Sequence, residues 1–334
     1  MTQLHVAAPT QVRGDASGSM DVLVWYPAPP ATAEEPLPLG PPGHAQFDGG
    51  AVAFGAPVAG MQHPLIVLSH GTGGSAAMLA WLAQPLAASG YIVAAPNHPG
   101  NNALHPYTVQ GFSLPWLRAG DLSLTIDALL ASPRFAPFID AHRIAAAGFS
   151  LGGYTMMEIA GARTDLAGLA AYCRTAKAQP NCAGPPEFPD LTARADALAE
   201  ADPSFAAARA DQGASYRDAR VRSVFAIAPA IGPAVTAASL AAIAIPVAVV
   251  VGSNDTIAPG PDNAQRYAAA IPGATLEIVP DAGHYTFLDD CLAAGLTEQP
   301  LLCTDPPGAD RARVHAHVAD EAVAFFGRTL RAQQ

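Results

Sequence analysis

Short runs of apolar residues alternate with helix-like stretches along most of the chain. The clearest run is 64–69, Pro-Leu-Ile-Val-Leu-Ser, in which almost every position is apolar. A run of this kind is typical of a central parallel strand, because helices cover both of its faces. The stretch 75–89 that follows has helical character and ends at Gly90, and glycine commonly terminates helices. This unit predicts the start of a parallel sheet.

The same alternation continues after Gly90 and resumes in the last third of the chain. Strands and helices that alternate predict a doubly wound α/β sheet with helices on both faces. With an opening pair of strands, the pattern predicts eight strands in a mostly parallel sheet. The predicted strands are 4–7, 20–26, 64–69, 91–95, 143–148, 221–228, 247–251 and 275–279, and the helices after the first are 117–131, 151–162, 236–243, 261–270 and 311–330.

Residues 163–220 interrupt the alternation. They contain a proline-rich segment, 184–189, and an Ala/Asp/Arg-rich helical stretch, but no strand pattern. We therefore expect an inserted cap at 163–220, with one sheet domain formed from 1–162 and 221–334. A Pro/Gly-rich excursion at 27–63 precedes the first central strand and predicts loops.

The composition limits the possible partners. Half of the residues are hydrophobic, 13% are charged, and the formal net charge is −11. A chain this acidic has no basic surface with which to bind nucleic acid. Apolar runs such as 243–251, broken by Pro246, are far shorter than the roughly 18 residues of a membrane helix. We expect a globular monomer or weak dimer with no nucleic-acid partner and no membrane span.

The four cysteines form two local pairs, Cys173 with Cys182 and Cys291 with Cys303. Proximity favours these two disulfides among the three possible connectivities. The spacing does not resemble a zinc site, so no metal is expected. Disulfides favour a secreted or periplasmic protein, although the first residues lack signal-peptide features, so the signal peptide would be absent from this sequence. Reduced thiols in a cytoplasmic protein are the alternative.

One segment has the form of a nucleophile elbow: Gly148-Phe149-Ser150-Leu151-Gly152. The pattern alone is weak, because short Gly/Ser patterns recur by chance. Here it lies between a predicted strand and a predicted helix, where a serine in a tight turn needs flanking glycines to avoid crowding. We predict that Ser150 is a nucleophile; a serine that only caps the helix is the alternative.

A serine nucleophile needs a histidine base and an acid that orients the histidine. On this fold the order along the chain is serine, acid, histidine. Asp255 follows the apolar strand 247–251 and His284 follows the strand 275–279, which predicts that they are the acid and the base. Among the competing residues, Asp262 fits a helix cap and Asp281 a turn. His315 and His317 lie in the predicted terminal helix.

The negative oxygen that forms during acyl transfer needs two preorganised N–H donors. We assign these to Leu151, directly after the nucleophile, and to Thr72 in the glycine-rich loop 70–74, His-Gly-Thr-Gly-Gly. The loop matches neither nucleotide-binding fingerprint, so no cofactor is expected.

Four further residues are predicted to line the substrate pocket: His98, Phe112, Trp116 and Tyr285. For His98 the alternative is a hydrogen bond that stabilises a loop. For Phe112 and Trp116 it is ordinary core packing.

Three segments, 70–74, 95–100 and 148–154, carry a resemblance to a known group. The chain resembles the bacterial α/β-hydrolases described as dienelactone-hydrolase-like and related to platelet-activating factor acetylhydrolase, from Trp25 to about Phe326. Dienelactone hydrolases use a cysteine nucleophile, whereas this chain has Ser150. The acetylhydrolases place their acid soon after the strand that follows the elbow, but 228–233 contains no carboxylate here.

The resemblance and the predicted triad together imply a serine carboxylic ester hydrolase that acts on small to medium acyl, aryl or polyester-type esters. An amide, lactone or thioester hydrolase with the same triad is the alternative. A hydrolase-fold binding protein with a vestigial triad is the third hypothesis.

Overall fold

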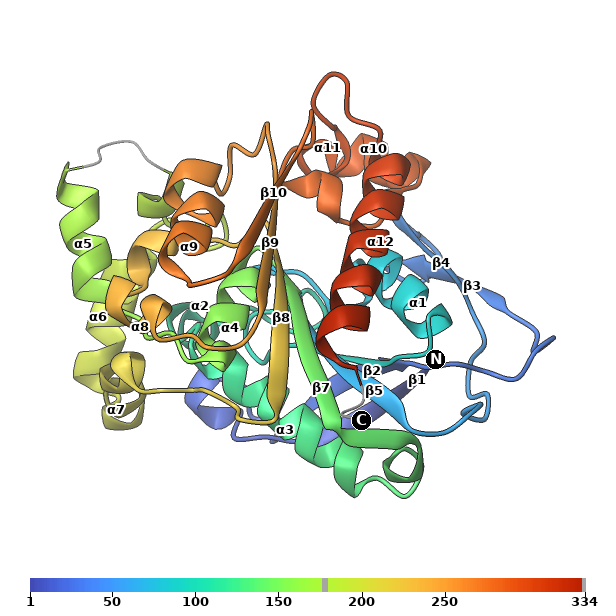
Figure 1. Cartoon of the computed structure of the whole chain (residues 1–334). Helices are drawn as coiled ribbons and strands as arrows, with labels where there is room; N and C mark the ends of the chain where they lie inside the picture. The colour runs from blue at the N-terminus through green and yellow to red at the C-terminus, as the bar shows by residue number, and fades with distance from the viewer. Residues whose placement is uncertain (176–179, 332–334) are drawn as a thin grey trace.

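The protein is built around one eight-stranded sheet (Figure 1). The computed structural model describes residues 1–175 and 180–331. The strand order is β1-β2-β6-β5-β7-β8-β9-β10; β2 pairs antiparallel with both β1 and β6, and the remaining pairs are parallel. The bounds are β1 Thr2–Ala7, β2 Ser19–Trp25, β5 His63–Ser69, β6 Ile92–Pro96, β7 Ile139–Phe149, β8 Val221–Ile227, β9 Val247–Gly252 and β10 Thr275–Val279. The predicted mostly parallel, eight-stranded α/β sheet is confirmed.

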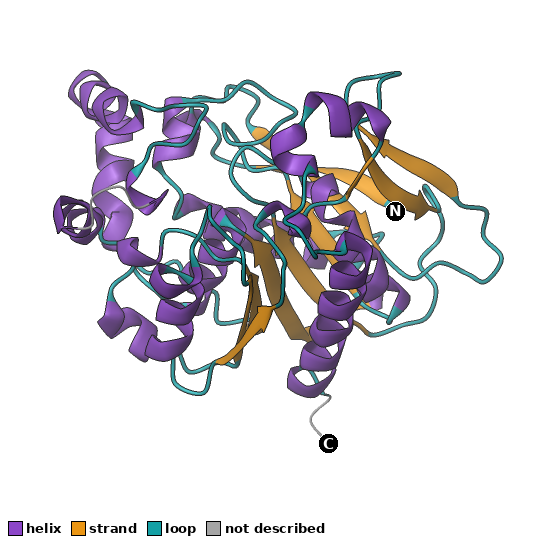
Figure 2. Cartoon of the chain, turned by 90° about the horizontal axis from the view of Figure 1, so that it is seen from above, coloured by secondary structure: helices purple, strands orange, loops and turns teal. Residues whose placement is uncertain are grey.

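The central strands are mostly apolar, because helices cover both faces of the sheet (Figure 2). In β5, Leu65 and Val67 belong to one apolar cluster, whereas Ile66 and Leu68 belong to another. Successive side chains of a strand point to opposite faces, so the clusters lie on opposite sides. Burial of each such side chain contributes roughly 1.5–3 kcal/mol. The first cluster includes residues of α3 (Leu117–Ala131), α4 (Leu151–Ala160) and α9 (Ala264–Ala270), and the second includes residues of α1 (Ala80–Ala88) and α12 (Arg311–Thr329).

The Pro/Gly-rich excursion at 27–63 contains two strands that the pattern did not predict. These are β3 (Glu35–Leu39) and β4 (Phe47–Val52), which pair with β11 (Asp290–Cys291) in a second, antiparallel sheet at the right of Figure 1. The register shifts between Pro36 and Pro38 in β3, which lies at the edge of this sheet. Edge strands and bulges are the places where a sheet accepts proline. The expectation of loops was therefore wrong here.

The insertion at 163–220 contributes no strand to either sheet among its described residues; positions 176–179 lie outside them. It forms α5 (Leu166–Thr175), α6 (Leu191–Ala201) and α7 (Pro203–Ala210), which lie at the left of Figure 1 together with α8 (Ala237–Ala241). A small apolar cluster joins it to the segment after α2 (Val109–Ser113), and its fully buried members are Leu114, Trp116, Ala195 and Phe205.

Both predicted disulfides are present. Cys173 is bonded to Cys182 within the insertion. Cys291 is bonded to Cys303 and links β11 to α11 (Pro300–Cys303), on either side of α10 (Ala293–Glu298). Within the described ranges, no helix is both long and apolar enough to cross a membrane.

The helix that follows the elbow contains a buried carboxyl group, Glu158. Thr164 donates a hydrogen bond to Glu158 Oε1 at 2.9 Å, and Thr164 Oγ1 also bonds the hydroxyl of Tyr154. Glu158 Oε2 has no partner among the described residues. Burial raises the pKa of Glu158 to about 8. The folded protein therefore holds a proton that the unfolded chain, with the ordinary carboxyl pKa, has already released at neutral pH.

This proton predicts a pH dependence of stability. Between about pH 5 and 8, Glu158 is ionised in the unfolded chain but protonated in the folded protein. The free energy of unfolding therefore falls as the pH rises through this range, by on the order of 1–5 kcal/mol in total. Glu158→Gln should remove this loss, so the variant gains stability relative to wild type as the pH rises from 5 to 9 in urea unfolding. The exposed Glu200→Gln on α6 is the control. The prediction would be contradicted if the difference in the free energy of unfolding between wild type and Glu158→Gln does not change with pH.

Candidate active site

Ser150 occupies a sharp turn between β7 and α4. Its backbone angles are φ 58° and ψ −117°, a region that is strained for a residue with a side chain. The flanking glycines make the turn possible: a Cβ atom at Gly148 would lie 2.3 Å from the Gly152 carbonyl oxygen, and one at Gly152 would lie 1.9 Å from the Ser69 carbonyl oxygen. The strand, the turn and the neighbouring strand β5 are thus packed backbone against backbone.

The structure brings Ser150, His284 and Asp255 together in one hydrogen-bonded chain. Ser150 Oγ lies 2.9 Å from His284 Nε2, and His284 Nδ1 lies 2.7 Å from Asp255 Oδ2. Each residue follows the carboxyl end of a parallel strand, β7, β10 and β9 respectively. Ser150 is 8% exposed, and the other two residues are also buried.

The partners of Asp255 determine which imidazole nitrogen carries the proton. Asp255 Oδ1 accepts hydrogen bonds from the backbone N–H groups of Ile257 at 3.0 Å and Ala258 at 2.7 Å. Its other oxygen faces His284 Nδ1, which must then be the protonated nitrogen. Nε2 is left to accept the hydroxyl hydrogen of Ser150. This arrangement can transfer the serine proton to His284 and stabilise the imidazolium that forms.

The loop after β5 lies directly against the nucleophile. A Cβ atom at Gly71 would lie 3.2 Å from both the Ser150 Cβ and the Phe149 ring. The next N–H group along this loop is that of Thr72. Within residues 1–175 and 180–331, neither the Thr72 nor the Leu151 N–H group donates a hydrogen bond to the protein. Two free donors beside a serine can hold a negative oxygen.

His98 is not available to a substrate, so its assignment to the pocket was wrong. Its side chain is fully buried, its Nε2 lies 2.9 Å from Ser69 Oγ, and its Nδ1 lies 2.7 Å from Asp121 Oδ2. The alternative interpretation, a hydrogen bond that stabilises the loop, describes the structure.

The three predicted aromatic pocket residues lie in different environments. Trp116 is fully buried in the cluster that joins the insertion to α3, which is ordinary core packing. Phe112 packs edge to face against Phe188 of the insertion, with ring centroids 4.9 Å apart. Tyr285 stays partly exposed and packs edge to face against His284, with a centroid distance of 5.2 Å.

Two residues near the loop 70–74 were missed from the sequence. The hydroxyl of Tyr107 donates a hydrogen bond to the Gly73 carbonyl at 2.8 Å. The exposed Glu187 of the insertion lies close to the same glycine: a Cβ atom built on Gly73 would lie 2.9 Å from Glu187 Oε1. Burial, and then the nearby Glu187 carboxylate, raise the pKa of Tyr107 and of Tyr285. Neither Tyr107 nor Glu187 belongs to a periodic pattern or a motif.

In the part of the chain that the structure describes, no group of three or more potential metal-binding side chains is clustered.

The packing of the elbow predicts a sharp difference between two glycines. Gly152→Ala should destabilise the protein by more than about 3 kcal/mol or prevent folding, because the methyl group would overlap the Ser69 carbonyl. Gly120→Ala, in α3, has no atom within 4 Å of the new Cβ and should be neutral or stabilising by up to about 1 kcal/mol. Thermal unfolding of both variants measures the difference, and equal stabilities would contradict the packing described.

Comparisons with known proteins agree with this fold. Residues 66–294 match the model of the Alpha/beta hydrolase family. A solved ferulic acid esterase from Streptomyces cinnamoneus superposes with a TM-score of 0.62 at 20% identity, covering 99% of this chain and 90% of that one. A puromycin-hydrolyzing peptidase from Mycobacterium tuberculosis gives a TM-score of 0.54 at 15% identity, covering 99% of this chain and 39% of that one. No curated protein sequence matches. Because the family match spans well over half of the residues, this chain belongs to the alpha/beta hydrolase family.

Proposed function

We propose that the protein is a serine carboxylic ester hydrolase with Ser150 as nucleophile, His284 as base and Asp255 as the orienting acid. The observation that carries the proposal is the continuous hydrogen-bonded chain of these three residues, with distances of 2.9 Å and 2.7 Å, beside the free N–H groups of Thr72 and Leu151. The esterase activity named for the structurally similar Streptomyces protein supports an ester substrate.

The first half of the reaction forms an acyl-enzyme. His284 Nε2 takes the hydroxyl proton of Ser150 while Oγ bonds to the ester carbonyl carbon, and the carbonyl oxygen becomes negatively charged. The N–H groups of Thr72 and Leu151 donate hydrogen bonds to that oxygen; loss of one such donor typically lowers kcat about 10²–10³-fold. When the carbonyl re-forms, the bond to the leaving oxygen breaks, and His284 gives its proton to that oxygen. An alcohol leaves, and the acyl group stays on Ser150.

The second half hydrolyses the acyl-enzyme. His284 removes a proton from a water molecule as the water oxygen bonds to the acyl carbon. The same two N–H groups stabilise the negative oxygen. Collapse breaks the bond to Ser150 Oγ, which recovers its proton from His284, and a carboxylic acid is released.

We propose small to medium acyl, aryl or polyester-type esters as substrates, which is what the resemblance to the dienelactone-hydrolase-like group implies. Tyr285 lies beside the base, and the edge-to-face contact of Phe112 with Phe188 lies where the insertion meets the region of the loop 70–74. We propose that residues 163–220 act as a cap that borders the substrate. The same triad could also cleave an amide, lactone or thioester.

Two disulfides are most stable in an oxidising compartment, so we propose that the protein is secreted or periplasmic.

Replacement of the nucleophile gives the first test. Ser150→Ala should reduce p-nitrophenyl acetate turnover to below about a ten-thousandth of wild type, because triad residues act as a unit. The exposed Ser89→Ala is the matched control and should retain full activity. Turnover by Ser150→Ala above that level, with the melting temperature unchanged, would exclude Ser150 as the nucleophile.

A matched ester and amide pair tests the bond that is cleaved. We expect kcat/KM for p-nitrophenyl acetate to exceed that for p-nitroacetanilide by more than about 10³-fold, since an amine must be protonated as it leaves and is the poorer leaving group. Ratios near one, measured with the same enzyme preparation, would favour an amidase in place of an esterase.

A further inference from the structure

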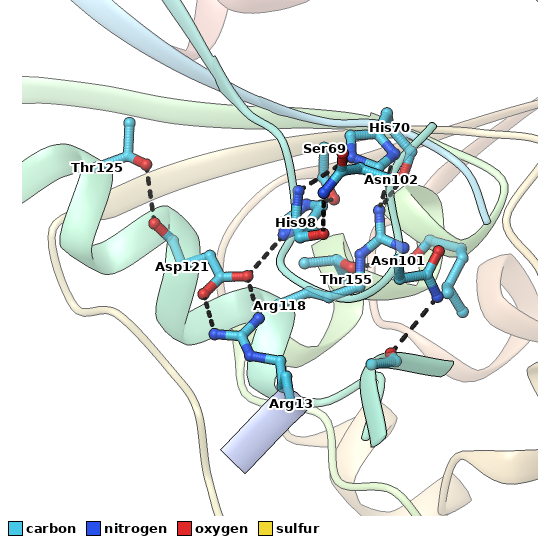
Figure 3. A network of polar contacts seen from close by, with 12 residues as sticks. Arg13, Ser69, His70, His98, Asn101, Asn102, Arg118, Asp121, Thr125 and Thr155 are labelled. Carbon is cyan, nitrogen blue, oxygen red and sulfur yellow. Dashed lines mark hydrogen bonds and ion pairs between the residues drawn. The ribbon is translucent and has the colours of Figure 1, made fainter. Parts of the chain in front are cut away.

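A network of buried polar side chains lies behind the loop 70–74 (Figure 3). It joins the end of β5, the segment after β6, helix α3 and the short helix η1 (Gln11–Arg13). Burial of charged groups is costly unless each is paired and hydrogen-bonded, so a network of this size in a core calls for an explanation. Its central members are each at most 3% exposed: Arg13, Ser69, His70, His98, Asn101, Arg118 and Asp121.

The network fixes His98 in one tautomer. Arg13 binds both carboxylate oxygens of Asp121, and Asp121 Oδ2 accepts a hydrogen bond from His98 Nδ1 at 2.7 Å. Nε2 of His98 then accepts the hydroxyl hydrogen of Ser69 at 2.9 Å. Burial, followed by the charge of Arg118, lowers the pKa of His98 to about 3, so the ring is neutral.

His70 is fixed in the same way. Its Nε2 accepts a hydrogen bond from the backbone N–H of His98 at 3.2 Å, so its Nδ1 carries the proton and donates to the Gly71 carbonyl at 2.7 Å. Arg118 donates a hydrogen bond to the His70 carbonyl. Burial and the charge of Arg118 lower the pKa of His70 well below its usual range, which keeps this ring neutral as well.

The bond from His70 to Gly71 sets the direction of the Thr72 N–H group. The Gly71 carbonyl and the Thr72 N–H belong to one planar trans peptide unit, so they point in opposite directions. His70 and the N–H of Gly74, at 3.3 Å, hold the carbonyl oxygen. On the far side of Thr72, the N–H of Gly73 is held by Asn101 Oδ1 at 2.7 Å. The Thr72 N–H is therefore held in one direction, in a loop that lies against Ser150.

We propose that His70 is a positioning residue for ester hydrolysis: its neutral ring, held by Arg118 and His98, directs the Thr72 N–H at the negative oxygen of the transition state. This inference rests on the proposed esterase function. According to this proposal, the buried network orients the Thr72 N–H group without contacting the reacting atoms.

Two replacements of His70 separate this role from simple packing. His70→Asn keeps a side-chain N–H near the position of Nδ1, whereas His70→Leu fills similar space without a donor. We expect His70→Leu to lower kcat for p-nitrophenyl acetate by about 10–100-fold with KM changed less than about threefold, because the lost interaction acts in the transition state. His70→Asn should recover most of kcat. If His70→Leu does not fold, His70→Gln, whose amide reaches the Nε2 position, replaces it.

A transition-state analogue gives a readout that a structural role would not change. Across wild type and the His70 variants, the inhibition constant of a trifluoromethyl ketone should rise in proportion to the fall in kcat/KM, since both depend on the oxyanion donors. The exposed His142→Leu is the control and should match wild type. The inference is overturned if the His70→Leu and His70→Asn variants lose activity equally, if kcat is retained in both, or if analogue binding does not change.

Failure of the proposed function itself would look different, because wild type would then neither hydrolyse esters nor react with a fluorophosphonate at Ser150.

Discussion

The close packing of the β7–α4 turn onto the end of β5 is the constraint on which the site depends. Ser150 is held at φ 58°, and the Gly152 backbone lies so near the Ser69 carbonyl that no side chain fits between them. Since β5 and β7 are neighbouring parallel strands, the loop that follows β5 must then lie against the serine. The strained turn thus holds Ser150 against the loop 70–74 before any substrate arrives. If the Thr72 N–H is the oxyanion donor, as we propose, this packing meets the condition for electrostatic stabilisation without reorganisation.

Among the described residues there are two Ser-His-Asp chains with the same distances, and they differ in their surroundings. In both, the serine oxygen lies 2.9 Å from Nε2 and the carboxylate lies 2.7 Å from Nδ1. Ser69 and His98 are fully buried, and the second carboxylate is paired with Arg13, so this second chain is out of reach of a substrate. Asp255 is instead held by two backbone N–H groups, and Ser150 retains 8% exposure, whereas Ser69 has none. Triad distances alone therefore do not define an active site; access and free N–H donors are also needed.

Sequence reasoning predicted the features that depend on local pattern. Apolar runs located the central strands, and glycines on both sides of Ser150 indicated the elbow. Asp255 and His284 could be chosen because each follows a predicted strand, and parallel strands end at one edge of the sheet. Local spacing also predicted both disulfides.

Features that depend on distant residues could not be predicted in this way. The second sheet pairs a Pro/Gly-rich segment with β11, more than 200 residues later, and neither partner has a strand pattern. The burial of His98 depends on Asp121 and Arg13, which are 108 residues apart in the chain. A histidine after a strand looks the same whether it faces a pocket or a buried carboxylate. The contacts of Tyr107, and of Glu187 in the insertion, with Gly73 likewise join segments that lie far apart in the chain.

The most direct test of the central claim is the detection of an acyl group on Ser150. The enzyme would be mixed with p-nitrophenyl trimethylacetate, whose bulky acyl group slows the second step, and quenched in acid within the first turnover. We predict a burst of p-nitrophenol equal to the enzyme concentration and, by mass spectrometry, one trimethylacetyl group on the peptide that contains Ser150. No burst, or an acyl group on another residue, would contradict the account.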